Sequence, residues 1–120
     1  MADFPTYLPA LITPFTPSGE LDLKAQAHNV RQLADAGIEG FLIAGSTGEG
    51  PYLEPGERAR LIKAVRRRKT HLMVGIAAET TRMGLRLVDE AVAAGADSLL
   101  VLTPTNMARN RDDVVARYFQ

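Results

Sequence analysis

Short apolar segments alternate with segments of helical periodicity along the whole chain. Their near-continuous apolar character is typical of parallel strands buried on both faces, and glycine, proline or short polar residues bound each one. The pattern therefore predicts four strands, with Thr13 at the C-terminal end of the first. The predicted strands cover residues 8–13, 38–44, 71–77 and 98–103.

The first two predicted helices have recognisable start and stop signals. Asp22 is a suitable N-cap for the first, and Gly37 supplies its stop. Pro55 is suited to the first position of the second helix, because proline there lacks only an N–H that would be unpaired anyway. We expect the cations at 66–69 to form the end of this helix, where they complement its dipole.

The last two predicted helices follow the third and fourth strands. Thr80 or Thr81 caps the third helix and Gly95 ends it, while a fourth begins at Arg111 and continues to Gln120 without a stop signal. The apolar spacing predicts that the inner face of the third helix consists of Leu85, Val88, Ala91 and Val92.

The order strand–helix, repeated four times, predicts an α/β fold with a parallel sheet. Ala36-Gly37 and the apolar residues after it recur two units later, at Ala94-Gly95. Both a doubly wound sheet and a (β/α)8 barrel fit this order. Polar residues recur at the strand ends, and the fourth helix looks interrupted. We therefore favour a (β/α)8 TIM barrel, with residues 1–120 as the N-terminal half of that single domain.

The loop Gly45-Ser46-Thr47-Gly48-Glu49-Gly50 joins the second strand to the second helix. Its glycines allow a sharp turn and a close approach to a ligand, while the adjacent hydroxyls and backbone N–H groups are donors for an anion. The loop is therefore a candidate site for a carboxylate or a phosphate. A tight turn without a ligand is the alternative, since glycine and serine are also common in ordinary turns.

Composition narrows the class of protein. The chain has 120 residues, 46% of them hydrophobic and 23% charged, which is typical of one globular domain. Its formal net charge is zero, so nothing favours nucleic acid or an anionic membrane as a partner. It has no cysteine, no N-terminal signal pattern and no apolar stretch of membrane-spanning length. We expect a cytoplasmic protein without a metal site.

These landmarks resemble the dihydrodipicolinate synthase and N-acetylneuraminate lyase family. The similarity lies in Leu11-Ile12-Thr13-Pro14-Phe15, in residues 40–49 with Leu53 and Glu57 after them, and in the fourth strand with Pro104. It runs from about Leu8 to Gln120. Family members are (β/α)8 barrels, usually homotetramers, so the resemblance implies that this chain supplies the first four units.

The resemblance also implies a reaction. Family members form a Schiff base between a lysine and pyruvate or another 2-oxo acid, which allows carbon–carbon cleavage, condensation or loss of water without a further cofactor. By similarity, Ser46 belongs to a proton relay. Thr47, with the backbone of Gly45 and Gly48, would bind the carboxylate of the 2-oxo acid.

Two departures from the family's pattern limit this interpretation. Thr105 and Asn106 stand where family members commonly have a tyrosine pair, one of which completes a proton relay. An amide does not replace a phenol in that role, and Tyr118 lies within the following helix. We therefore place lyases or dehydratases of sugar-derived 2-oxo acids first. Dihydrodipicolinate synthase, which condenses pyruvate with an aldehyde, is the alternative.

The Schiff-base lysine is the second departure. The lysines of this chain are expected on exposed helical positions, whereas a Schiff-base lysine must lose its charge through burial or a cationic neighbour. The resemblance places the family's lysine and its other catalytic tyrosine beyond Gln120. We expect this segment to be inactive alone, and a non-catalytic half-barrel is a further alternative. The lysines are Lys24, Lys63 and Lys69.

Overall fold

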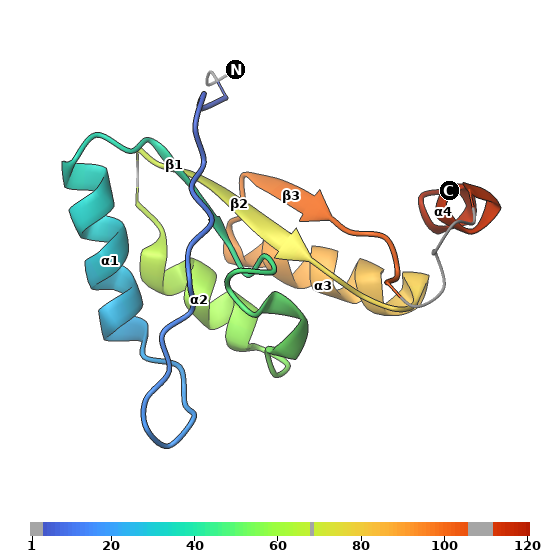
Figure 1. Ribbon diagram of the computed structural model, residues 1–120, viewed down its shortest axis with the longest axis horizontal. Coiled ribbons are helices and arrows are strands. Elements are labelled where there is room, and N and C mark those ends of the chain that lie inside the picture. The colour runs from blue at the N-terminus through green and yellow to red at the C-terminus, as the bar shows by residue number, and fades with distance from the viewer. Residues whose placement is uncertain (1–3, 68, 106–111) are drawn as a thin grey trace.

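The computed structural model describes residues 4–67, 69–105 and 112–120. The described elements form a parallel sheet in the order β1-β2-β3, and α1, α2 and α3 lie side by side along one face of it, with α4 set apart at the end of the chain (Figure 1). Their bounds are α1 Leu23–Asp35, β1 Gly40–Ile43, the 3-10 helix η1 Gly50–Tyr52, α2 Glu57–Val65, β2 His71–Ile76, α3 Thr81–Ala94, β3 Ser98–Val101 and α4 Asp112–Tyr118.

The core lies between the sheet and these helices. Phe41, Val74 and Ile76 on the strands and Ile62 on α2 are completely buried. Each such side chain contributes about 1.5–3 kcal/mol through burial of apolar surface. β2 is the central strand, paired with β1 and β3, and its residues Leu72, Val74 and Ile76 are buried in this core.

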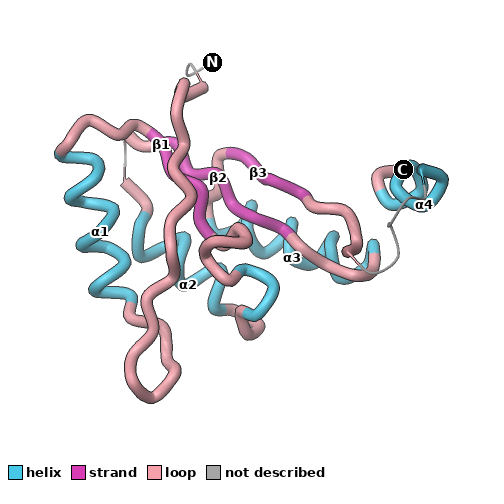
Figure 2. Tube along the Cα trace, in the orientation of Figure 1, coloured by secondary structure: helices cyan, strands magenta, loops and turns pink. Residues whose placement is uncertain are grey.

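The predicted first strand does not form as a regular strand. The N-terminal segment runs beside β1 as a loop and makes a single bridge, between Ala10 and Leu42 (Figure 2). Leu11 N donates to Leu42 O at 2.9 Å and Leu42 N donates to Pro9 O at 3.0 Å. Pro9 and Pro14 lack the N–H groups that a longer ladder requires. The prediction of a regular strand over residues 8–13 is therefore wrong, although the segment does pair with β1 at one bridge.

The second and fourth predicted strands are shorter than expected. The second begins at Gly40 rather than residue 38 and stops at Ile43, because Ala44 has φ of 52°, which no strand residue adopts. The fourth ends at Val101 instead of Thr103. Both strands therefore turn into loops earlier than their apolar pattern predicts.

The second helix also differs from its prediction at both ends. Pro55 is not a helical residue: Gly56, with φ of 85°, is the N-cap and Glu57 is the first helical residue. The helix ends at Val65, so the cations from Arg66 onward do not form its last turn. Arg66 instead contacts Asp97, and Arg68 lies outside the described residues.

The third helix has its predicted ends but not its predicted inner face. Thr80 is the N-cap and accepts from Met83 N, and Gly95 is the C-cap in the left-handed region. Leu85 and Val92 are wrong as core residues, because they are 59% and 58% exposed. A narrower stripe packs on α2 and β2 instead, formed by Gly84, Leu87, Val88, Ala91 and Ala94.

The first helix follows its prediction. The carboxylate of Asp22 accepts a hydrogen bond from Ala25 N at 2.9 Å, and Gly37, with φ of 95°, follows the C-cap.

In the part of the chain that the structure describes, no helix combines the length and apolar character that crossing a bilayer requires. The fourth helix is described from Asp112, and Arg111, its predicted start, lies outside the described residues.

Asp97 ties the strands together at their N-terminal ends. Its carboxylate accepts a hydrogen bond from Leu72 N at 2.7 Å. It also accepts hydrogen bonds from Arg66, and Nη2 of that residue lies 3.0 Å from Asp97 Oδ1. Burial alone would raise the pKa of Asp97, but the hydrogen bonds from Arg66 and Leu72, with the charge of Arg66, hold it below its ordinary value. The ionised carboxylate therefore stabilises the folded state.

This lowered pKa predicts a pH-dependent effect of Asp97→Asn. Stability from a carboxylate with a depressed pKa is present above its unfolded pKa and is lost as pH falls through the folded value. We expect Asp97→Asn to cost about 1 kcal/mol near neutral pH and progressively less below about pH 4, measured by urea unfolding. Asp35→Asn is the control, since Asp35 meets Arg67 only at 3.9 Å and is exposed. An equal loss for both variants, or a loss independent of pH, would contradict the role of Asp97.

Candidate functional site

The glycine loop lies at the C-terminal ends of β1 and β2. A cavity of about 230 Å³ opens there, and Ser46 and Thr47 are on its wall together with residues from the ends of all three strands. The lining residues are Ala10, Leu42, Ala44, Gly45, Ser46, Thr47, Pro51, Gly75, Ile76, Ala77, Leu100 and Leu102. The structure therefore brings together the predicted residues Gly45, Ser46 and Thr47, while Gly48 is buried behind them.

A close backbone contact shapes the loop. Ala44 has a positive φ, which is unusual for a residue with a side chain, and its carbonyl oxygen lies against the Cα atoms of Gly50 and Gly75. A Cβ on either glycine would overlap that oxygen. The turn out of β1 therefore requires glycine at two positions far apart in sequence, and strained backbone of this kind is frequent at functional sites.

The hydrogen bonds of the loop divide its amides into two groups. Glu49 N donates to Ser46 O at 3.2 Å and Gly50 N donates to Gly45 O at 2.9 Å, which closes the loop. Among the described residues, the amides of Ser46, Thr47 and Gly48 have no acceptor. Both hydroxyl-bearing residues are also exposed. The donors that remain for a ligand thus lie in residues 46–48 of the loop.

Two buried side chains hold the loop from behind. Thr13 Oγ1 donates to Gly48 O at 2.6 Å, so the residue predicted at a strand end becomes a brace of the loop. Arg58, which is 2% exposed, donates from Nη2 to Gly50 O at 2.8 Å. Sequence reasoning missed Arg58, because an arginine in Glu57-Arg58-Ala59-Arg60 is typical of an exposed helix surface. No local signal distinguishes it from Arg60.

Polar residues after β2 and β3 meet at the neighbouring part of the same rim. Thr105 Oγ1 donates to Glu79 Oε1 at 2.8 Å, which links the two loops. Tyr118 is half-buried, and its hydroxyl donates to Ala78 O at 3.4 Å. Burial, and to a smaller extent Glu79, raises the pKa of Tyr118, so its proton is held. Asn106 lies outside the described residues.

The lysines and acidic residues add no reactive centre here. Lys24, Lys63 and Lys69 are all exposed, and none of them lines the cavity at the glycine loop. Within residues 4–67, 69–105 and 112–120, no three histidine or acidic side chains come together as metal ligands. Among the described residues, the loop thus offers donors for an anion without a lysine beside them.

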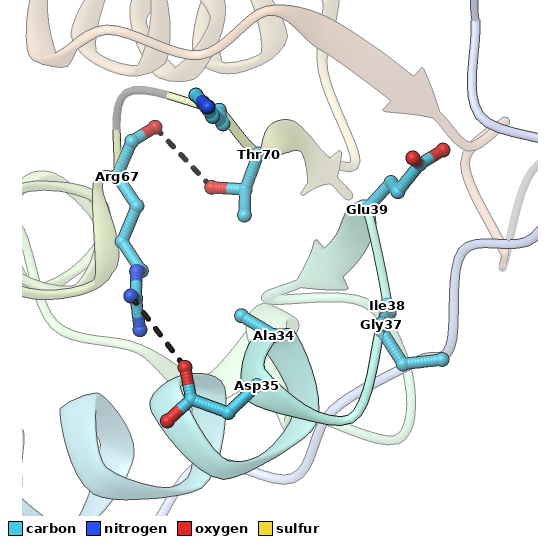
Figure 3. Close-up of a pocket in the computed structure, with 8 residues that line it drawn as sticks. Ala34, Asp35, Gly37, Ile38, Glu39, Arg67 and Thr70 are labelled. Carbon is cyan, nitrogen blue, oxygen red and sulfur yellow. Dashed lines mark hydrogen bonds and ion pairs between the residues drawn. The ribbon is translucent and has the colours of Figure 1, made fainter.

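A larger hollow, of about 510 Å³, lies at the opposite ends of the strands (Figure 3). Arg67 and Glu39 are on opposite sides of it, and Arg67 is directed toward Asp35. Thr70 Oγ1 donates to Arg67 O at 3.3 Å. Its charged side chains are exposed, and ligands of parallel α/β folds bind at the C-terminal strand ends. The smaller cavity at the glycine loop is therefore the better candidate site.

Comparison with known proteins assigns the chain to a family. The model of the Dihydrodipicolinate synthetase family matches residues 3–120. The chain belongs to the Dihydrodipicolinate synthetase family. Its fold accordingly corresponds to the first βα units of a (β/α)8 barrel, as predicted, and the doubly wound alternative is excluded.

Curated relatives and solved structures agree with this membership of the Dihydrodipicolinate synthetase family. The 4-hydroxy-tetrahydrodipicolinate synthase of Kineococcus radiotolerans is 39% identical over 104 residues, which cover 84% of this chain and 34% of that protein. The synthase of Acidothermus cellulolyticus is 39% identical over 106 residues, 86% of this chain and 34% of that protein. The chain spans about a third of these relatives' length.

A structural relative covers nearly the whole chain. The structure of a putative dihydrodipicolinate synthase family protein from Coccidioides immitis matches with a TM-score of 0.86 at 31% identity, covering 96% of this chain and 38% of that one. The prediction that the resemblance extends from the first strand into the fourth unit is confirmed.

The backbone contact at Ala44 predicts a large effect of Gly50→Ala. The new methyl group would overlap the Ala44 carbonyl, so we expect a loss of at least about 2 kcal/mol in the free energy of unfolding, measured by urea unfolding. Gly19→Ala is the control: Gly19 also has positive φ but open space around it, so only backbone strain of about 1 kcal/mol applies. Equal losses would show that the contact adds nothing.

Proposed function

We propose that this chain supplies the carboxylate-binding loop of a lyase that forms a Schiff base with pyruvate or a sugar-derived 2-oxo acid. Membership of the Dihydrodipicolinate synthetase family supports the class of reaction. In this proposal Thr47 and the free amides of the loop bind the carboxylate, and Ser46 transfers a proton to or from the substrate. The active protein is a homotetramer whose lysine comes from outside residues 1–120.

The observation that carries the proposal is the arrangement of donors at the cavity. The amides of Ser46 and Thr47 on the cavity wall, and of Gly48 behind them, have no acceptor among the described residues, and two exposed hydroxyls lie beside them. Consecutive N–H groups in a turn form a site for an anionic oxygen. Apolar residues of β1, β2 and the segment after β3 line the rest of the cavity, which suits the short carbon chain of a 2-oxo acid.

A second candidate function is condensation of pyruvate with an aldehyde. The curated relatives at 39% identity are both 4-hydroxy-tetrahydrodipicolinate synthases, which favours this reaction. Against it, Thr105 is committed to Glu79 and carries no phenol for a proton relay. The lyase or dehydratase therefore stays first.

Borohydride trapping tests the shared chemistry. The complete polypeptide that carries these residues is treated with pyruvate and borohydride, and a lysine adduct is sought by mass spectrometry. We expect an adduct, because borohydride reduces a protonated imine to a stable amine. Absence of an adduct with pyruvate and with every sugar-derived 2-oxo acid tested would remove the mechanism. Release of pyruvate from a sugar-derived acid separates the lyase from an aldehyde-condensing synthase.

Two substitutions separate the roles of the hydroxyls. We expect Ser46→Ala to lower kcat about 10²-fold or more with little change in KM, since it removes a proton-transfer group. Thr47→Val should raise KM for the 2-oxo acid about tenfold, since it removes a donor to the carboxylate. Both are read from steady-state kinetics.

Ser18→Ala is the matched control, because Ser18 carries an exposed turn hydroxyl that contacts only Thr16 among the described residues. It should leave both constants unchanged. Parent-like kinetics in Ser46→Ala and Thr47→Val would exclude these roles.

A further inference from the structure

Arg58 is a buried cation directly beneath the glycine loop. It is the second residue of α2 and is 2% exposed, whereas Arg60 on the same helix is exposed. Burial is the main reason why the pKa of Arg58 is lowered, and Glu90 on α3 opposes that effect. A buried guanidinium carries a large desolvation cost, which an apolar side chain of similar size would avoid. Its presence calls for a specific use of its donors.

The guanidinium joins two separate parts of the backbone. Nη2 donates to Gly50 O at 2.8 Å, at the end of the loop, and Nε donates to Gly75 O at 3.2 Å, within β2. The planar guanidinium holds its donors at fixed angles, so two such bonds also define how the loop is oriented over the strand. A lysine ammonium has no such geometry.

The two carbonyls belong to the residues that contact Ala44. Gly50 and Gly75 lie on either side of the Ala44 carbonyl, and Gly50 N closes the loop onto Gly45 O at 2.9 Å. Any shift of Gly50 relative to Gly75 would therefore move the peptide between Ala44 and Gly45, which precedes Ser46 and Thr47. A bond network that contains Arg58 thus reaches the donors of the cavity without Arg58 itself touching it.

We propose that Arg58 is a positioning residue that fixes the glycine loop over β2 and so sets Ser46 and Thr47 at the angle needed to bind a 2-oxo acid. The identity of the ligand in this inference rests on the proposed function, whereas the positioning of the loop by Arg58 does not. It assigns a role to a residue outside the cavity lining, and the role depends on the fork of donors rather than on the positive charge alone.

The test compares Arg58→Met, which has similar length but no donors, with Arg58→Lys, which keeps the charge. Arg60→Met is the matched control on the same helix. Val65→Ala is a second control, because Val65 is buried on α2 and its truncation destabilises the helix packing away from the loop. All variants are made in the complete polypeptide.

Two readouts are used. The first is a titration of borohydride trapping with pyruvate, which gives both the half-saturating pyruvate concentration and the amount trapped at saturation. The second is hydrogen exchange at the amides of residues 46–50, compared with those of β2.

We expect Arg58→Met to raise the half-saturating pyruvate concentration about tenfold and to speed exchange in the loop more than in β2. Arg58→Lys should show a smaller change of the same kind, and Arg60→Met none. Val65→Ala should speed exchange in α2 and β2 while leaving the half-saturating concentration at its parent value. That separation distinguishes positioning from general stability.

Three results would overturn the proposal: parent-like values in a folded Arg58→Met, parent-like values in Arg58→Lys, or the same rise of the half-saturating pyruvate concentration in Val65→Ala. If Arg58→Met does not fold, Arg58→Lys decides by the same measurements. If the parent protein forms no adduct, the proposed function fails. In that event hydrogen exchange alone decides the role of Arg58, and parent-like loop exchange in its variants overturns it.

Discussion

The structure of the site depends on one backbone contact, between the carbonyl oxygen of Ala44 and the Cα atoms of Gly50 and Gly75. At this contact Ala44 has positive φ, β1 ends one residue earlier than predicted, and the chain turns into the glycine loop. Side chains at either glycine would exclude it. The shape of the loop is thus set by β2 as much as by the loop's own sequence, because Gly75 lies in the neighbouring strand.

Two buried donors complete this arrangement from behind. Thr13 donates a hydrogen bond to the carbonyl oxygen of Gly48, and Arg58 donates one to the carbonyl oxygen of Gly50. Both of these carbonyl oxygens are therefore paired. A buried carbonyl without a partner would cost about 1–3 kcal/mol, and the pairing removes that cost. It also leaves the outer side of the loop rich in donors, since the amides of Ser46 to Gly48 have no acceptor among the described residues.

How far the sequence predicts this structure depends on the range of the interaction. The caps at Asp22, Thr80 and Gly95 were predictable because each acts within its own turn. The N-terminal segment was predicted as a strand, but it makes only one bridge to β1, because the effect of its prolines on the ladder was underestimated. The exposure of Leu85 on α3 was not predictable, since helical spacing alone does not say how wide a stripe the neighbouring elements cover.

The burial of Arg58 shows the same limit at the candidate site. Its identity suggests a solvated residue, and only the approach of α2 to Gly50 and Gly75 gives its guanidinium two acceptors.

The prediction of an anion site at the loop rests on glycines and adjacent hydroxyls, which act locally. The contacts that fix the shape of the loop come from residues distant in sequence, Thr13, Arg58 and Gly75. The proposed chemistry also needs a residue from elsewhere, because Lys24, Lys63 and Lys69 are exposed. A site of this kind separates binding from reaction. In the proposed function, the end of β1 would hold the carboxylate, and a lysine from another part of the barrel would activate the 2-oxo acid at the same rim.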